Sequence, residues 1–249
     1  MSLQHLIAIH QPNFFPWLGY FAKIFQADTF IILDDVQYPR TNTGTWSNRV
    51  KMLLGEPKWL TMPVKRSNSL LTTYKEIQIS SATSWREKIC KTLQTFYGKS
   101  LFFKEYFPLC EPLIYNPTSS LLTYNVQAIK GILNILQWKN DSLRMASEFT
   151  VTSQGTQRLI DLVKVAGGNA YLAGGGTGGY QEDHLFAEQG VYLRYQNFCH
   201  PVYAQTGQQF VPGLSILDAL FNIGSEQTKN LLNGTCLGLQ LLSDKNIGM

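Results

Sequence analysis

Short apolar runs alternate with amphipathic stretches in the first part of the chain. Residues 6–10 and 29–33 are apolar runs, the second one rich in β-branched and aromatic residues. Between them, residues 16–25 carry a proline start and the apolar pattern of a helix. Buried strands joined by a helix are typical of a parallel α/β sheet. We therefore expect a strand, a helix and a second strand here.

The middle of the chain is predicted to hold a hairpin followed by three helices. A hairpin-like or extended stretch covers residues 46–64, with Gly55 and Pro57 at the turn and a returning strand over residues 59–64. Three segments then repeat their apolar residues at helical spacing: residues 84–97, 102–115 and 117–138. Pro108 is expected to break the second helix, because proline lacks the backbone N–H.

The last part of the chain returns to alternating strands and helices. Strands are expected over residues 143–149, 170–173 and 191–196. Helices are expected over residues 156–166, 181–189 and 216–223, the last one ending at Gly224.

The complete pattern predicts one α/β domain over residues 1–249. Its core is a Rossmann-like parallel sheet built from residues of about 1–65 and 142–200. The three helices of about 84–138 form a helical insertion, and residues of about 212–249 form a C-terminal helical segment.

Composition places the chain among globular proteins. Of its 249 residues, 44% are hydrophobic and 15% are charged, and 21 basic against 17 acidic residues give a net charge of +4. The basic residues are scattered from Lys23 to Lys245 rather than gathered into a stripe. We therefore expect no nucleic-acid partner.

Cysteine spacing and hydropathy predict a cytoplasmic protein. The four cysteines are far apart and form no CxxC pair, so no zinc signature is present and we assign no metal site. The N-terminus has neither the basic region nor the long apolar core of an export signal. The longest hydrophobic segment, residues 129–138, is too short for a membrane span.

The first segment with candidate chemistry is His10-Gln11-Pro12-Asn13, between the first strand and the first helix. Polar side chains at the carboxyl end of a parallel strand face the crevice where α/β proteins bind ligands, and a helix N-terminus offers free N–H groups to an anion. A phosphate site is one interpretation. A tight, packed turn fixed by prolines and aromatic residues is the other.

Two adjacent carboxylates, Asp34 and Asp35, follow the second strand. Neighbouring side chains of a strand point to opposite sides, so only one of them can face a given cleft. We expect one to be a base or metal ligand and the other a cap or ion-pair partner. The alternative is a solvated acidic turn, with Arg49 and Lys51 on the surface.

A glycine-rich loop lies between a predicted strand and a predicted helix, at residues 174–179. Five of these six residues are glycine, so backbone N–H groups can surround a phosphate without interference from side chains. The loop matches neither the Walker loop nor the GxGxxG dinucleotide motif. A flexible lid that binds no anion is the alternative.

A histidine late in the chain is a further candidate. His200 precedes a proline and lies near Tyr203 and Gln205, so it is positioned to line a sugar or amine pocket. The alternative is a loop histidine hydrogen-bonded to the backbone. Ser215 and Asp218 fit a helix start better than a catalytic pair.

These segments resemble the WbqC-like protein family, in order and across nearly the whole chain. The resemblance is carried by HQPNFFPWLGYFAKIFQAD, FIILDDVQY, Asn48-Arg49, YLAGGGTGGY, HPVYAQ and FVPGLSILDALFNIG. It implies a cytoplasmic enzyme of O-antigen or other surface-polysaccharide (lipopolysaccharide) biosynthesis that acts on a nucleotide-linked sugar, with glycine transfer to an amino sugar as the suggested reaction. The chain departs from the family pattern at residues 174–179, where a Ser-Gly start and fewer glycines are usual.

A weaker likeness is to the nucleotidyltransferase superfamily of Rossmann-like folds. In that superfamily a His-x-Gly-His element opens the first helix and binds ATP phosphates. Here Trp17 and Tyr20 stand in place of the two histidines, and only Gly19 matches. The cationic donors that stabilise phosphate charge are therefore missing. Either His10 and Lys23 replace them, or ATP is not the substrate.

The resulting hypothesis is a transferase or ligase that joins an amino acid to a nucleotide-linked amino sugar, with ATP as a candidate cofactor. His10 is the candidate base, and Asp35 is the candidate to orient the ammonium or a metal. The candidates for cofactor binding are Gln11, Asn13, Gly19, Lys23, Gly174, Gly175, Gly176 and Thr177. The candidates for substrate binding are Asp34, Gln37, Asn48, Arg49, Tyr180 and His200. The alternative is a non-catalytic protein that binds a nucleotide-sugar or serves as a scaffold in a glycan assembly complex.

Overall fold

A five-stranded parallel sheet forms the centre of the molecule. The computed structural model describes residues 4–39, 45–65, 72–81, 84–139, 141–175, 181–207 and 209–243. The strands are β1 (Leu6–His10), β2 (Thr29–Ile32), β5 (Leu143–Met145), β6 (Ala170–Gly174) and β7 (Tyr192–Gln196), in the order β5-β2-β1-β6-β7. Every neighbouring pair is parallel. The prediction of an α/β, Rossmann-like sheet is confirmed.

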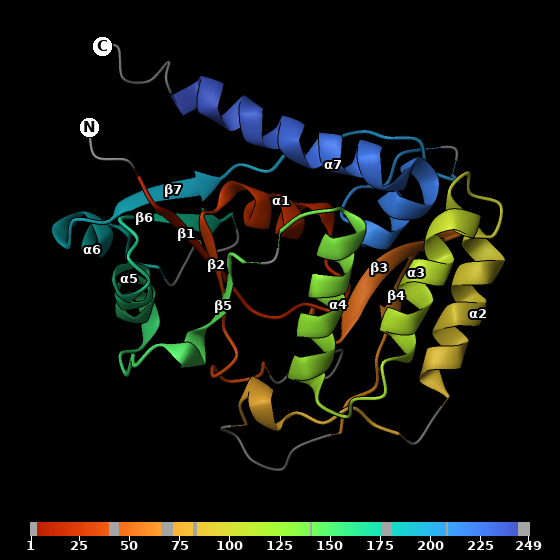
Figure 1. Ribbon diagram of the computed structural model, residues 1–249, viewed down its shortest axis with the longest axis horizontal. Coiled ribbons are helices and arrows are strands. Elements are labelled where there is room, and N and C mark those ends of the chain that lie inside the picture. Colours follow the sequence, from red (N-terminus) through yellow and green to blue (C-terminus); the bar gives the residue numbers. More distant parts are fainter. Residues whose placement is uncertain are drawn as a thin grey trace.

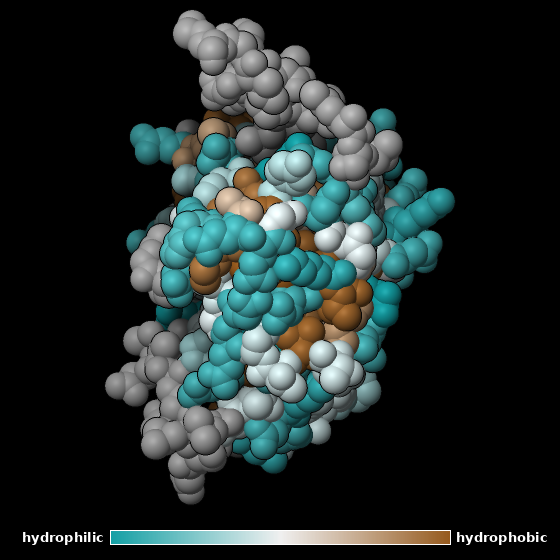
Figure 2. Space-filling model, turned by 90° about the vertical axis from the view of Figure 1, so that its left-hand side faces the viewer, coloured by the Kyte–Doolittle hydropathy of each residue, from teal (hydrophilic) through white to brown (hydrophobic). Residues whose placement is uncertain are grey.

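Helices cover both faces of this sheet (Figure 1). The helices on one face are α1 (Leu18–Gln26) and α7 (Ile216–Ser243), and those on the other are α5 (Gly155–Val165) and α6 (Asp183–Glu188). Alternate strand residues supply two separate cores: Ala8 and Leu172 belong to the α1 side, and Ile7 and Tyr171 to the α5 side. The outer side of α5 and α6 is largely polar, with apolar side chains showing between the polar ones (Figure 2).

The remaining elements pack against the α1 side. They are the antiparallel hairpin β3 (Arg49–Leu54) and β4 (Glu56–Thr61), the helices α2 (Trp85–Tyr97), α3 (Phe103–Tyr115) and α4 (Leu121–Ile135), and the short 3-10 turn η1 (Tyr74–Glu76), whereas the 3-10 turn η2 (Ala146–Glu148) belongs to the α5 side. Their buried side chains are continuous with those of α1 and α7 in one hydrophobic core. In the sequence, the hairpin and these helices thus lie between the strands β1 and β2 and the strands β5, β6 and β7 of the parallel sheet.

Two proline predictions are wrong. Pro57 lies within β4, opposite Leu53, and Gly55 with its φ of 77° makes the hairpin turn. An edge strand tolerates a proline whose missing N–H would face away from its partner. Pro108 and Pro112 both lie inside an uninterrupted α3. Phe107, Cys110 and Ile114 of the same helix are buried in the core, and this packing outweighs the cost of about 3 kcal/mol for a helical proline.

The last helix, α7, consists of two helices that meet at a kink. Gly224, with a φ of 75° and a ψ of 175°, is not helical, so the predicted helix over residues 216–223 ends there as expected, and a second helix that was not predicted follows it. The ring of Phe102 lies against this glycine, 3.0 Å from where a Cβ would be. In the part of the chain that the structure describes, no helix is both long and apolar enough to cross a membrane.

Candidate functional site

The crevice at the carboxyl ends of β1 and β6 is the candidate site. From β1 the chain passes through α1 to β2, whereas β6 lies on the other side of β1 and leads to α6 on the opposite face of the sheet. The two connections therefore diverge, and such a switch point is where open α/β sheets bind ligands. The pairing of Ala8 with Leu172 places His10 level with Gly174.

Lys23 reaches from α1 to the ends of both strands. Its side chain is buried, and Nζ donates a hydrogen bond to the Ile9 carbonyl at 3.0 Å. Nζ also lies 5.9 Å from the centre of the Tyr171 ring and 4.0 Å from where a Cβ on Gly174 would be. Burial lowers the pKa of the Lys23 ammonium to about 7. The protein thus holds a group at the switch point that can gain or lose a proton near neutral pH.

His10 lies beside Lys23 and is held in one tautomer. Its ring packs edge-on against Tyr20, with centroids 4.9 Å apart, and Nδ1 lies 3.1 Å from the Gln11 carbonyl oxygen. A carbonyl only accepts, so Nδ1 carries the proton and Nε2 keeps its lone pair. Burial, followed by the positive charge of Lys23, lowers the pKa of His10 to about 4. The imidazole is therefore neutral at pH 7, with a basic nitrogen available.

The turn between β1 and α1 is held in a strained conformation. Phe15 has a φ of 38°, a region that bulky residues rarely adopt. Ser215 Oγ donates to the Phe15 carbonyl at 2.7 Å, and the Phe14 N–H donates to the Trp46 carbonyl at 2.9 Å. Asn13, in the same turn, is 4% exposed. A buried polar side chain is thus fixed in the predicted phosphate segment.

Gly19 accommodates an aromatic ring. A Cβ at this position would lie 2.1 Å from the Trp17 indole. Trp17 also packs against Phe198 and His200, each with ring centroids 5.2 Å away. His200 Nδ1 accepts a hydrogen bond from the Gly213 N–H at 3.3 Å. Gly19 and His200 therefore both belong to the packing around Trp17.

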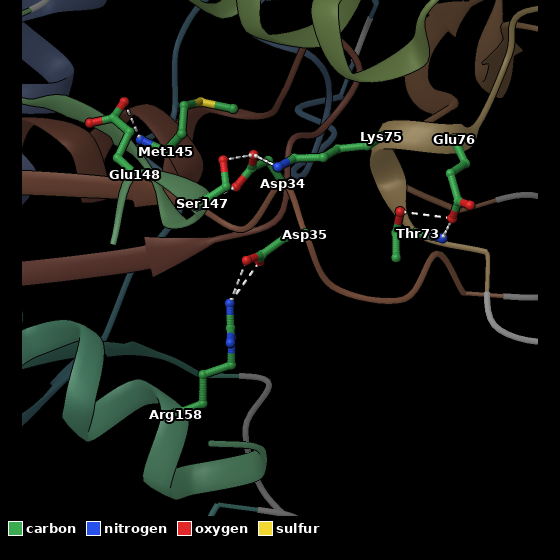
Figure 3. Close-up of polar contacts among 9 residues, drawn as sticks. All are labelled: Asp34, Asp35, Thr73, Lys75, Glu76, Met145, Ser147, Glu148 and Arg158. Atoms are coloured by element: carbon green, nitrogen blue, oxygen red, sulfur yellow. Dashed lines mark hydrogen bonds and ion pairs between the residues drawn. The ribbon is translucent and has the colours of Figure 1, made fainter. Parts of the chain in front are cut away.

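Asp34 and Asp35 point in different directions (Figure 3). Asp34 is buried, accepts hydrogen bonds from the N–H and the hydroxyl of Ser147, and pairs with Lys75 at 3.2 Å. Asp35 accepts two hydrogen bonds from Nη2 of Arg158 on α5, at 2.7 and 2.8 Å. His10 packs against α1, whereas Asp35 is bound by α5, which covers the opposite face of the sheet. The structure does not bring these two candidates together.

The ion pairs and hydrogen bonds of these carboxylates join the segment after β2 to η1, η2 and α5. Each carboxylate already has a cationic partner in the folded chain. Within the described ranges, no group of three or more His, Cys, Asp or Glu side chains is placed to hold a metal ion.

The candidates on the hairpin, Asn48 and Arg49, make contacts within the hairpin region. Asn48 accepts from the Thr45 N–H and the Tyr38 hydroxyl and donates to the Met62 carbonyl, so its amide fixes the start of the hairpin. The Arg49 guanidinium lies 4.1 Å from the centre of the Trp59 ring.

The other predicted site residues lie in the segments that follow β1, β2 and β6. Gln37 is exposed on the segment between β2 and the hairpin, and Gly175 is exposed where the glycine-rich loop begins. The Gln11 carbonyl accepts from both His10 and Tyr20. Gly176, Thr177 and Tyr180 lie outside the described residues.

Sequence reasoning missed three residues of the crevice. Tyr20 donates to the Gln11 carbonyl at 3.1 Å, Tyr171 lies beside Lys23, and Gln196 donates to the Gly19 carbonyl at 2.9 Å. Gln196 ends a predicted strand, so the rule that selected His10 selects it as well. The two tyrosines carry no such signal, because their spacing is that of ordinary core residues.

Comparison with known proteins identifies relatives along most of the chain. The profile of the WbqC-like protein family matches residues 11–230. "Uncharacterized protein Rv1507c" of Mycobacterium tuberculosis is 28% identical over 225 residues, which cover 88% of this chain and 94% of that protein. No solved structure matches the chain significantly.

Proposed function

The chain belongs to the WbqC-like protein family, and we propose that it transfers an amino acid, such as glycine, to the amine of a nucleotide-linked amino sugar. The family supports a role in polysaccharide-associated biosynthesis. One observation carries the proposal for the site: Lys23, His10 and Gly174 meet at the switch point between β1 and β6. A buried cation and a neutral histidine at such a point suit an anionic substrate and proton transfer.

In the proposed reaction, ATP first activates the amino acid. The carboxylate oxygen bonds to the α-phosphorus and pyrophosphate leaves, which gives an acyl-adenylate. The sugar amine then attacks the acyl carbon, so that a C–N bond forms and the C–O bond to AMP breaks. The proton that the amine loses passes to Nε2 of His10.

In this proposal Lys23 stabilises the negative charge of the bound substrates and the negative charge that forms in the transition state. Its other N–H groups are directed away from the Ile9 carbonyl and are available to a phosphate or an oxyanion. A nearby phosphate favours the charged form of the amine. Substrate binding should therefore raise the pKa of Lys23 above its value in the free protein.

The test is amide formation from glycine, ATP and UDP-glucosamine, followed by mass spectrometry. We expect His10→Gln to lower turnover by about a hundredfold to ten-thousandfold, the range for a general base, with the melting temperature nearly unchanged. His184→Gln is the matched control, because His184 is exposed on α6. Near-normal turnover in His10→Gln would place the base elsewhere, with His200 as the next candidate.

Binding measurements separate catalysis from a scaffold role. A nucleotide-sugar at a hundred times its dissociation constant stabilises the fold by about 2.7 kcal/mol, which a thermal shift detects. Stabilisation by UDP-glucosamine without any product would favour the non-catalytic alternative. Neither binding nor product would contradict the proposal.

A further inference from the structure

Two tryptophans lie exposed and in contact on the β3–β4 hairpin. Trp46 is 42% exposed and Trp59 is 38% exposed. Their ring centroids are 5.1 Å apart with the planes at 68°. Aromatic side chains of this size usually contribute to a core, and exposed ones that cluster mark interaction surfaces.

Two cations share this face. Register pairs Lys51 with Trp59 and Arg49 with Thr61, so the alternation of the strands places Arg49, Lys51 and Trp59 on one side of the hairpin. Trp46, just before β3, joins this face through its contact with Trp59. The Lys51 ammonium lies 5.3 Å from the Trp59 ring, and the Arg49 guanidinium lies 4.1 Å from it. Lys51 makes no ion pair within the described part of the chain. The surface therefore combines two partly exposed indole rings with positive charge.

The backbone that presents these side chains is firmly anchored. Val50 and Leu60 are buried on the inner side of the hairpin. Ser47, between Trp46 and Asn48, hydrogen-bonds through its hydroxyl to Tyr74, and its carbonyl accepts from Asn125. In the segment 46–51, Ser47, Asn48 and Val50 are thus buried supports for the more exposed residues between and beside them. A surface fixed in this way loses little conformational entropy when it binds a ligand.

We propose that this face of the hairpin binds an acidic saccharide. The apolar C–H face of a sugar ring stacks on an indole, and a carboxylate on the same ring suits the nearby Lys51 and Arg49. A single-stranded nucleic acid also stacks on aromatic rings, but it requires a longer track of cations than the two residues present. The surface lies beside the candidate crevice, since the Trp46 carbonyl bonds to Phe14. The proposal does not depend on the transfer reaction.

The test is isothermal titration of the full chain with trigalacturonate. Three further probes separate the contributions: the methyl-esterified trimer has the rings without the charge, acetate has the charge without a ring, and UMP has a nucleobase. We expect saturable binding of trigalacturonate alone. Trp46→Ala and Lys51→Gln should each weaken it at least tenfold, while Trp46→Phe and Lys51→Arg should retain most of it.

Tyr192→Ala is the control, because Tyr192 is a 57% exposed aromatic residue on the distant strand β7. It should bind trigalacturonate as the wild type does, and melting curves should show that every variant is folded. No binding by the wild type, or equal binding by Trp46→Ala, would overturn the proposal. Equal binding of the esterified trimer would refute the role of the charge. Binding of UMP that depends on Trp46, without binding of trigalacturonate, would replace the saccharide with a nucleobase.

Discussion

At the residue scale, the main feature is the coupling of two basic groups in the crevice. His10 and Lys23 both have pKa values lowered by burial, and the charge of Lys23 lowers that of His10 further. Each group is therefore more easily deprotonated in the folded chain than in the unfolded chain. Their presence makes the fold less stable on the acid side, a cost typical of groups kept for function.

Lys23→Met should remove a pH dependence of stability. Between pH 7 and 10.5 the folded wild type holds a neutral Lys23, whereas the unfolded chain holds a charged one. Fewer protons are bound in the folded state, so the free energy of unfolding should rise with pH, by up to about 1.4 kcal/mol per pH unit. Below pH 7 both states are protonated and this slope disappears. Urea unfolding of both proteins from pH 6 to 10 measures the difference, and equal slopes would show that Lys23 is charged in the fold.

Gly19→Ala should destabilise the protein by about 1 to 3 kcal/mol, the usual cost of overpacking. The added methyl group would overlap the Trp17 indole, which would then lose its contacts with Phe198 and His200. Urea unfolding measures the change. In a protein that already carries Trp17→Ala, adding Gly19→Ala should lower the free energy of unfolding much less, because the indole that the new methyl group would overlap is absent. Additive effects of the two substitutions would contradict this account.

At the scale of elements, a buried carboxylate joins α7 to α2 and to the segment before α7. Asp218 accepts from the hydroxyls of Tyr97 and Tyr203, both at 2.7 Å, and from the Gln205 amide at 3.0 Å. Burial raises the pKa of Asp218 against the effect of these donors. The HPVYAQ motif therefore supplies partners for this carboxylate, and His200 adds a contact to Trp17.

Tyr97→Phe should cost more stability than Tyr203→Phe. Each change removes one donor to Asp218, worth about 1.5 to 3 kcal/mol for a bond to a charged group. The Tyr97 hydroxyl also accepts from the buried Leu53 N–H at 2.9 Å, which would lose its partner. Urea unfolding at pH 8 measures both variants, with exposed Tyr192→Phe as the control. The reverse order would show that the Leu53 contact contributes little.

At the scale of the molecule, the helical layer and the sheet share one core. Buried residues of α1, the hairpin, α2, α3, α4 and α7 form a single cluster, and Trp138 stacks on Phe25 of α1 at 3.8 Å. The segment of helices predicted as an insertion is thus packed directly on the sheet's own helix. No separate hydrophobic core is left for it among the described residues.

The chain should therefore unfold in one cooperative transition. Helix content from far-UV circular dichroism and tryptophan fluorescence should give the same midpoint in urea, because neither part retains a core without the other. Tryptophans occur in the turn, the hairpin and α2, so fluorescence samples all three regions. Two separate transitions would instead show that the helices fold as their own unit.

Local patterns along the chain were sufficient to predict the fold class and most elements. Apolar runs such as residues 6–10 carry the signal of a buried strand, and polar residues after them mark the edge where ligands bind. These features depend on local spacing, which a sequence displays directly. The position of His10 at the carboxyl end of β1 follows from this pattern, whereas its alignment with Gly174 depends on the pairing of β1 with β6.

The contacts between distant side chains follow from the three-dimensional fold and could not be predicted from local patterns. The fold places Lys23 against Ile9 and Gly174, and it pairs Asp35 with Arg158, which is 123 residues away along the chain. It also kept α3 intact through its prolines, because packing outweighed the local preference. Such contacts depend on strand order, on the face from which a side chain projects and on burial. No spacing within a short window contains this information, and the same holds for the pKa values that burial sets.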